Sequence, residues 1–137
     1  MSNGVFFSKS LLISKAYSEL SGSSIRILNY FYMKRRLKKV KNRVGKDDGW
    51  AITNNGEIIF TRKEAAGKGF SESTFKRSVD ELIKVGLIDI DHQGTGLAGD
   101  CNRYSISDRW KLYGTDSFIV KKRQKQLRET KQLFKNR

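Results

Sequence analysis

The chain has no proline, one cysteine and one histidine among its 137 residues. A single cysteine, Cys101, cannot form an internal disulfide, and it excludes a cysteine-rich zinc site. That cysteine content suits a reduced, cytosolic compartment. No stretch approaches the roughly 20 apolar residues of a membrane-spanning helix, and the N-terminus lacks the pattern of a signal peptide. The sequence therefore predicts a cytoplasmic protein without a membrane partner.

Acidic residues are scarce at both ends of the chain. Residues 1–50 carry 11 Lys/Arg against 3 Asp/Glu, and residues 116–137 carry 8 against 2. The intervening residues 51–115 carry 9 of each, so the ends supply the net charge of +14. A strongly cationic surface attracts polyanions. Nucleic acid is the first candidate partner, and an anionic membrane surface is a distant second.

The length suits one domain with one hydrophobic core. We expect residues 1–115 to form the folded body and residues 116–137 a basic tail. The tail is either a helix that leaves the body or a disordered arm. Its apolar residues Val120, Leu127 and Phe134 are spaced seven apart. This spacing makes a second copy of the chain a candidate partner.

Two helices are expected before residue 42. Apolar residues at helical spacing predict the first over residues 8–20, with Ser8 or Ser10 as its N-cap. The second should run from about Ser24 to Val40. Its first half is apolar on most sides, which indicates burial, whereas its second half keeps only an apolar stripe among cations. The sequence thus predicts a helix that begins in the core and ends as a basic rod, with Lys34, Arg35, Arg36, Lys38, Lys39 and Lys41 on its surface.

A β-hairpin is expected after the polar loop 42–50. The short apolar runs Trp50–Thr53 and Glu57–Thr61 flank Asn54-Asn55-Gly56. Asn-Gly is a strong hairpin signal because both residues tolerate positive φ.

Residues 61–91 predict two helices joined by a sharp turn, followed by a strand. Thr61 and Glu64 form a capping box, and Gly67 and Gly69 end the first helix. Ser71 caps the second helix, which extends to Val85 with Phe75, Val79, Leu82 and Ile83 on its apolar face. Gly86 suits the left-handed position past its end, and the strand begins at Leu87.

Turn residues fill the segment 92–102, which we expect to be a flexible loop. Arg103–Ile106 is expected to be the return strand of a hairpin. Ser107 is a candidate cap for a short helix from Asp108 to Tyr113, with Gly114 at its end.

This order of elements resembles the winged helix-turn-helix family of DNA-binding domains, of bacterial or mobile-element type, over roughly residues 10–106. The residues that carry the resemblance are Ala65, Gly69, Ser71, Ser73, Thr74, Arg77, Leu82, Gly86 and Ile88, with the Asn-Asn-Gly turn between Ile52 and Ile59. The resemblance implies an α+β winged helix: a three-helix core containing a helix-turn-helix, with a small antiparallel sheet and wing. It also implies double-stranded DNA as the partner.

The helix from Ser71 to Val85 is expected to read the major groove. Its first hydroxyls and free backbone N–H groups suit phosphate, and Lys76 and Arg77 can reach guanine edges. The expected DNA contacts are Ser71, Ser73, Thr74, Lys76, Arg77 and Lys84 on this helix; His92, Gln93 and Arg103 at the wing; Arg35, Arg36, Lys38 and Lys39 on the basic rod; and Lys121, Lys122 and Arg123 in the tail. In the simpler interpretation Ser71 is only a cap and the cations are solvated.

Several alternatives stay open because Glu72, Asp80 and Glu81 leave this helix nearly neutral. The first hypothesis is that the protein is a sequence-specific regulator or the DNA-reading part of a replication or mobile-element system, nucleoid-associated if bacterial. Alternatively, it is a non-specific DNA- or RNA-binding accessory protein whose basic ends bind, or a protein-interaction module. No acid/base or nucleophile pair emerges, and Asp91, His92, Asp100 and Cys101 lack metal-ligand spacing. We therefore expect no enzyme, metal, cofactor or small-molecule ligand.

Overall fold

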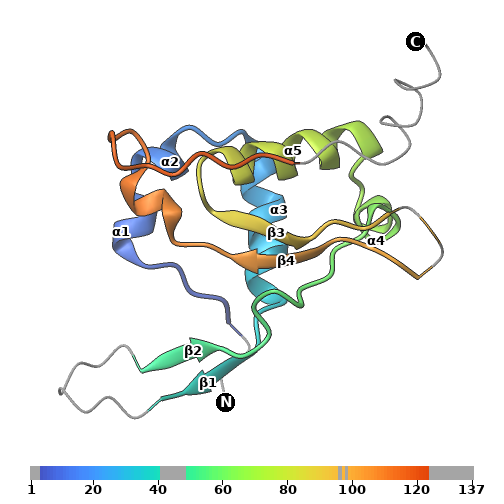
Figure 1. Cartoon of the computed structure of the whole chain (residues 1–137), viewed down its shortest axis with the longest axis horizontal. Helices are drawn as coiled ribbons and strands as arrows, with labels where there is room; N and C mark the ends of the chain where they lie inside the picture. Colours follow the sequence, from blue (N-terminus) through green and yellow to red (C-terminus); the bar gives the residue numbers. More distant parts are fainter. Residues whose placement is uncertain (1–3, 41–48, 96, 98, 124–137) are drawn as a thin grey trace.

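The structure is a computed structural model that describes residues 4–40, 49–95, 97 and 99–123. Over these ranges the chain is an α+β fold with five α-helices and two small antiparallel sheets (Figure 1). None of the described helices has the length and apolar character needed to cross a membrane. The elements are α1 (Lys9–Leu12), α2 (Lys15–Ser18), α3 (Gly22–Met33), β1 (Leu37–Lys39), β2 (Trp50–Ile52), α4 (Arg62–Gly67), α5 (Glu72–Lys84), β3 (Ile88–His92), β4 (Arg103–Ile106) and the 3-10 turn η1 (Arg109–Leu112).

A serine begins each of the first three helices. The side chains of Ser8, Ser14 and Ser21 each accept a hydrogen bond from a backbone N–H three residues later. The single helix expected over residues 8–20 was therefore wrong. Ser14 takes an extended backbone conformation and starts a new helix, α2. Its hydroxyl accepts the N–H of Tyr17 in place of the backbone carbonyl that a continuous helix would supply.

The helix expected to reach Val40 ends at Met33, which corrects the basic rod. Residues Leu37–Lys39 form β1 and pair antiparallel with β2, Leu37 opposite Ile52. The side chain of Asn54 explains the stop, because its Nδ2 donates to the carbonyl of Lys34 and its Oδ1 accepts the N–H of Arg36, both at 2.9 Å. These bonds satisfy backbone groups that a continuing helix would have paired internally. The predicted loop 42–50 lies mostly outside the described residues.

The hairpin expected around Asn54-Asn55-Gly56 has its turn but not its strand pairing. Gly56 has a φ of +85°, and the N–H of Glu57 donates to the carbonyl of Asn54 at 3.0 Å. Before this turn β2 pairs with β1, and after it Ile58 forms an isolated bridge with Tyr104. Both residues of that bridge are buried, so burial of apolar surface favours the distant partner over the local one.

The two helices of the central segment form where the sequence predicts them. The Thr61 side chain caps α4, Ser71 caps α5, and Gly69 between them has a φ of +93°. Gly86 follows α5 with a φ of +89°, as expected. The reciprocal arm of the predicted capping box differs, because the Glu64 carboxylate accepts from Lys34 Nζ at 2.7 Å.

Strands β3 and β4 form the predicted hairpin, with Ile88 opposite Ile106. The return strand Arg103–Ile106 is confirmed, and we call residues 93–102 the wing loop. The short helix expected from Asp108 to Tyr113 is the 3-10 turn η1, shorter than predicted. The Ser107 hydroxyl accepts the N–H of Arg109 at 3.1 Å.

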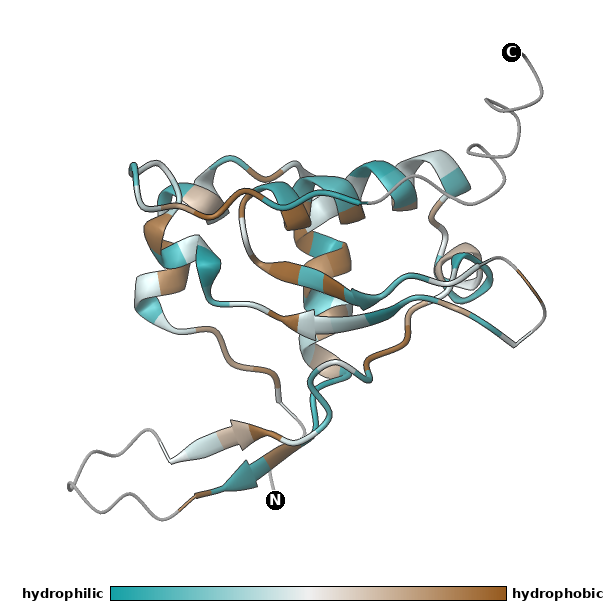
Figure 2. Ribbon diagram, in the orientation of Figure 1, coloured by the Kyte–Doolittle hydropathy of each residue, from teal (hydrophilic) through white to brown (hydrophobic). Residues whose placement is uncertain are grey.

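Aromatic rings join these elements into one core. The ring centroid of Phe31 on α3 lies 5.0 Å from Tyr104 on β4 and 5.2 Å from Phe60. Phe60 in turn lies 5.0 Å from Phe75 on α5. Figure 2 shows the result along α5, whose hydrophobic residues face the body and whose hydrophilic residues face outward.

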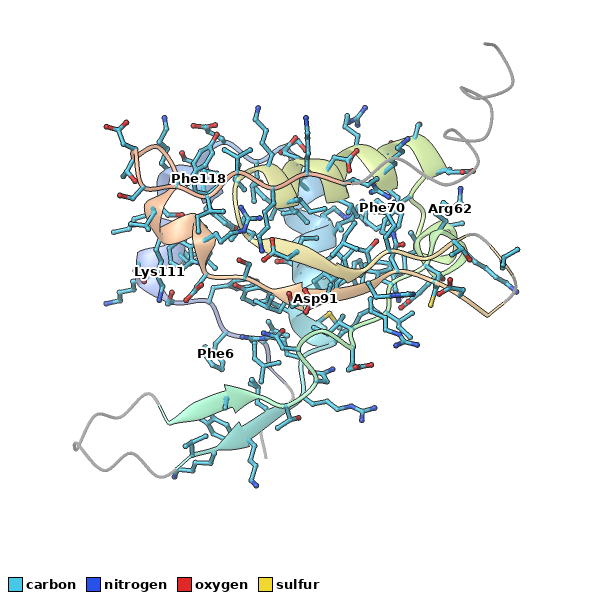
Figure 3. The ribbon with its side chains drawn as sticks, in the orientation of Figure 1. Phe6, Arg62, Phe70, Asp91, Lys111 and Phe118 are labelled. Carbon is cyan, nitrogen blue, oxygen red and sulfur yellow. The ribbon has the colours of Figure 1, made fainter. Side chains whose placement is uncertain are left out.

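Residues 118–123, which we call the strap, run alongside α5 (Figure 1). The strap begins at Phe118, whose ring meets Tyr113 edge-on at 5.1 Å, beside η1 (Figure 3). Arg109 holds the next residue by donating to the carbonyl of Ile119 at 2.7 Å. The part of the predicted tail beyond Arg123 lies outside the described residues.

Candidate nucleic-acid interface

The outward face of α5 is polar, as the sequence predicts. Phe75, Val79, Leu82 and Ile83 are buried, together with Ser78. The exposed positions on the opposite side are Glu72, Ser73, Lys76, Arg77 and Lys84. Among the described residues, Lys76 and Arg77 make no hydrogen bond or ion pair. Their charges are therefore available to a ligand outside the chain.

The first turn of α5 offers backbone donors to that face. The Ser71 hydroxyl accepts the N–H of Thr74 at 3.2 Å and donates to Thr74 Oγ1 at 2.9 Å. These two predicted site residues are thus engaged in the helix cap. The N–H groups of Glu72 and Ser73 have no partner within the helix, because the first turn of any α-helix leaves its N–H groups free. Such groups favour anions.

All three acidic side chains of α5 have partners elsewhere in the fold. Glu72 pairs with Arg62 of α4. Asp80 accepts from Arg123 Nε of the strap at 2.8 Å. Glu81 accepts the backbone N–H of Ser21 at 2.6 Å. The helix that looks nearly neutral in sequence therefore presents paired acids, together with cations that no described residue pairs.

A hollow of about 450 Å³ separates the start of α5 from the wing loop. On the helix side it is lined by Arg62 and Lys63 of α4 and Lys76 of α5, and Arg123 of the strap also reaches it. Figure 3 shows Arg62 at the α4 end of the molecule. Sequence reasoning missed Arg62 and Lys63. Their place directly after the cap Thr61, in the first turn of the predicted helix-turn-helix, was the signal that could have found them.

Side-chain hydrogen bonds join the end of β3 and the described residues of the wing loop. His92 Nε2 lies 2.7 Å from Asp100 Oδ1, and Asp100 Oδ2 accepts from the Thr95 hydroxyl at 2.8 Å. The hydrogen bond with His92, followed by those with Thr95, lowers the pKa of Asp100 to about 2. His92, an expected DNA contact, therefore closes the loop in this structure. Gln93 is half-buried, and Arg103 is exposed with one nitrogen 3.9 Å from Glu57.

The cations predicted on the basic rod are not brought to α5. Arg35 is half-buried, its guanidinium lies 4.3 Å from the centre of the Tyr32 ring, and burial lowers its pKa. Arg36, Lys38 and Lys39 are exposed at β1. Figure 1 places the β1–β2 hairpin on the opposite side of the body from α5 and the strap. These cations and those of α5 form two separate surfaces.

The strap brings the other predicted cations next to α5. Arg123 pairs with Asp80, and Lys121 Nζ lies 3.6 Å from Asp89 of β3. Lys122 is exposed and makes no hydrogen bond or ion pair with a described residue. The structure thus assembles part of the predicted tail with the predicted reading helix.

The His, Cys, Asp and Glu residues of the described part form no group of three or more that could hold a metal. Of the four residues weighed for such a cluster, His92 and Asp100 meet, whereas Asp91 accepts from the Ser105 hydroxyl at 2.8 Å. Cys101 is a free, half-buried thiol. No known protein-family model, curated protein or solved structure matches this chain.

Proposed function

We propose that the protein is a winged helix-turn-helix domain that binds double-stranded DNA in a sequence-specific manner. The order α3, Ile58, α4, α5, β3, wing loop and β4 supports the fold. The isolated Ile58–Tyr104 bridge joins the segment before α4 to the β3–β4 hairpin. In this assignment α4 and α5 are the helix-turn-helix and α5 is the reading helix.

One observation carries the proposal: Lys76 and Arg77 have no partner among the residues that the structure describes, and they project from a helix whose acidic side chains are all paired. The 13 residues of α5 make it roughly 20 Å long, which suits insertion into a major groove. Arginine pairs bidentately with guanine, so Arg77 is assigned to base reading. Lys63, Lys76 and the free N–H groups at the start of α5 are assigned to phosphate.

In this role the protein performs no reaction on DNA. It is a transcription regulator or the DNA-reading component of a replication or mobile-element system, acting in the cytoplasm and associated with the nucleoid if the protein is bacterial. The charge of the α5 surface steers the duplex to the protein, and base contacts then select the site.

Selection from a pool of random duplexes tests the proposal, because a sequence-specific protein enriches a consensus. Against that consensus, Arg77→Ala should weaken binding by roughly 1–3 kcal/mol and relax the choice at one base pair. Its effect on random duplexes should be much smaller. Arg36→Ala is the matched control, since it removes the same side chain from an exposed position on the hairpin side of the molecule.

A second candidate function is non-specific binding of DNA or RNA by an accessory protein. The exposed cations Arg36, Lys38 and Lys39 favour it, because they lie away from α5 and make a second basic surface. This candidate predicts no consensus from the selection. It also predicts that Arg77→Ala weakens the binding of all nucleic acids by the same factor, and that Arg36→Ala does so too.

A further inference from the structure

The strap crosses a row of acidic side chains beside the outward face of α5. Asp80 projects from the helix with 43% of its side chain exposed. Asp89 on β3 is only 13% exposed and is already held by Arg109, with Nε–Oδ1 at 3.0 Å. Of these two carboxylates, that of Asp80 is therefore the one that would be exposed without a partner if the strap were absent.

The position of Asp80 on the helix makes its pairing consequential. Asp80 follows Arg77 by three residues and Lys76 by four, and side chains at these spacings are neighbours on a helix surface. An unpaired Asp80 carboxylate would therefore form ion pairs with the two cations assigned to DNA. It would also repel phosphate. Arg123 prevents both effects by occupying the carboxylate at 2.8 Å.

We propose that the strap is a charge-masking element: Arg123 neutralises Asp80 and so keeps Lys76 and Arg77 free for a nucleic-acid ligand. This inference rests on the proposed function of α5. The guanidinium of Arg123 is itself poorly placed to bind phosphate, since its side chain is only 16% exposed. Lys122, exposed at the preceding position, is the strap residue that contacts phosphate directly.

A double-mutant cycle on the full chain tests this division. At roughly 0.1 M salt, Arg123→Ala should weaken binding of the selected duplex by about tenfold. Adding Asp80→Asn to Arg123→Ala should restore most of the lost affinity, because no carboxylate is then left to be masked. Asp80→Asn alone should bind at least as tightly as the unmodified protein. A double variant that stays as weak as Arg123→Ala overturns the proposal and makes Arg123 a direct phosphate contact.

Two control variants separate masking from net charge. Lys122→Ala removes the same charge from the adjacent position, and Asp80→Asn should not restore its loss. Asp116→Asn removes one negative charge from the turn before the strap, outside these ion pairs, and should not rescue Arg123→Ala. A rescue by Asp116→Asn as large as that by Asp80→Asn overturns the specific role of Asp80.

The strap also covers the space between α5 and β3. Tighter DNA binding by Arg123→Ala than by the unmodified protein would overturn the masking proposal and show that the strap competes with DNA. Hydrogen exchange measured without DNA provides an independent readout. Arg123→Ala should raise exchange at the strap amides, and unchanged exchange contradicts the docking by Arg123. A further outcome is that the unmodified protein binds no duplex while Arg123→Ala still raises exchange at the strap amides. In that outcome the proposed function fails and the strap contact stands.

Discussion

Ser78 is a residue at which the fold carries a small stability cost. It is fully buried on α5, and its hydroxyl has no hydrogen-bond partner among the described residues. We expect Ser78→Ala to raise the free energy of unfolding by roughly 1 kcal/mol, because it removes an unpaired polar atom and improves helix propensity. Urea denaturation measures the change. Ser73→Ala on the exposed face is the comparison, because it loses only a 3.4 Å contact with the Ser71 hydroxyl and relieves no burial. An equal gain from both variants would contradict the burial argument.

Asp100 carries a pH dependence confined to the wing loop. Its pKa is lowered to about 2, first by His92, so the closed loop is favoured above the ordinary carboxyl pKa of 3.8. That preference is lost as the pH falls from 3.8 through 2. We expect NMR titration of the carboxyl carbon to give this low value and His92→Phe to raise it. A pKa that does not move in His92→Phe would show that Thr95 alone holds the carboxylate.

At the scale of elements, the turn from α5 into β3 depends on one glycine. A Cβ at Gly86 would lie 2.7 Å from the backbone nitrogen of Trp110, and its φ of +89° disfavours any other residue. Gly86→Ala should therefore lower the free energy of unfolding by roughly 2 kcal/mol or more. Gly67→Ala is its matched control, because a Cβ there meets nothing within 4 Å. Thermal unfolding should show a loss for the first variant and no loss for the second.

The elements that the sequence predicted correctly are those defined by local chemistry. Ser71 as the cap of α5, Gly86 past its end and the return strand Arg103–Ile106 each follow from residues within one or two turns of the feature. A side-chain cap or a left-handed glycine acts on its immediate neighbours, so its signal survives folding. The polar face of α5 with Lys76 and Arg77 followed in the same way.

The errors arose where a distant partner decided the structure. The spacing of Met33, Leu37 and Val40 fits a helix, yet Asn54 and β2 take the backbone groups that would have continued it. Ile58 pairs across 46 positions with Tyr104 rather than with its local neighbour. The pairing of Asp80 with Arg123, 43 positions away, is equally invisible to a local pattern. Charge counts along α5 therefore understated its positive character.

At the scale of the whole molecule, the two basic surfaces predict different salt effects. When a duplex binds at α5, nearby cations neutralise some of its phosphates, and the counterions of those phosphates are released. Lys76→Ala should therefore reduce the slope of log affinity against log salt by about 1. Lys38→Ala, on the hairpin at the opposite side, should leave that slope unchanged. A reduction by Lys38→Ala equal to that by Lys76→Ala would show that one duplex reaches both surfaces.

Tyr104 also sets an order of events during synthesis of the protein. Its ring packs on Phe31, and its backbone bonds in both directions with Ile58, at 2.7 and 3.1 Å. A ribosome makes Phe31 and Ile58 well before it makes Tyr104, and synthesis proceeds at roughly 5–20 residues per second. For roughly 1–4 seconds the nascent chain therefore holds α3 and α5 without the strand that closes the core over them, since β4 ends 22 residues after α5. Newly made chains should depend on protection from aggregation until β4 emerges.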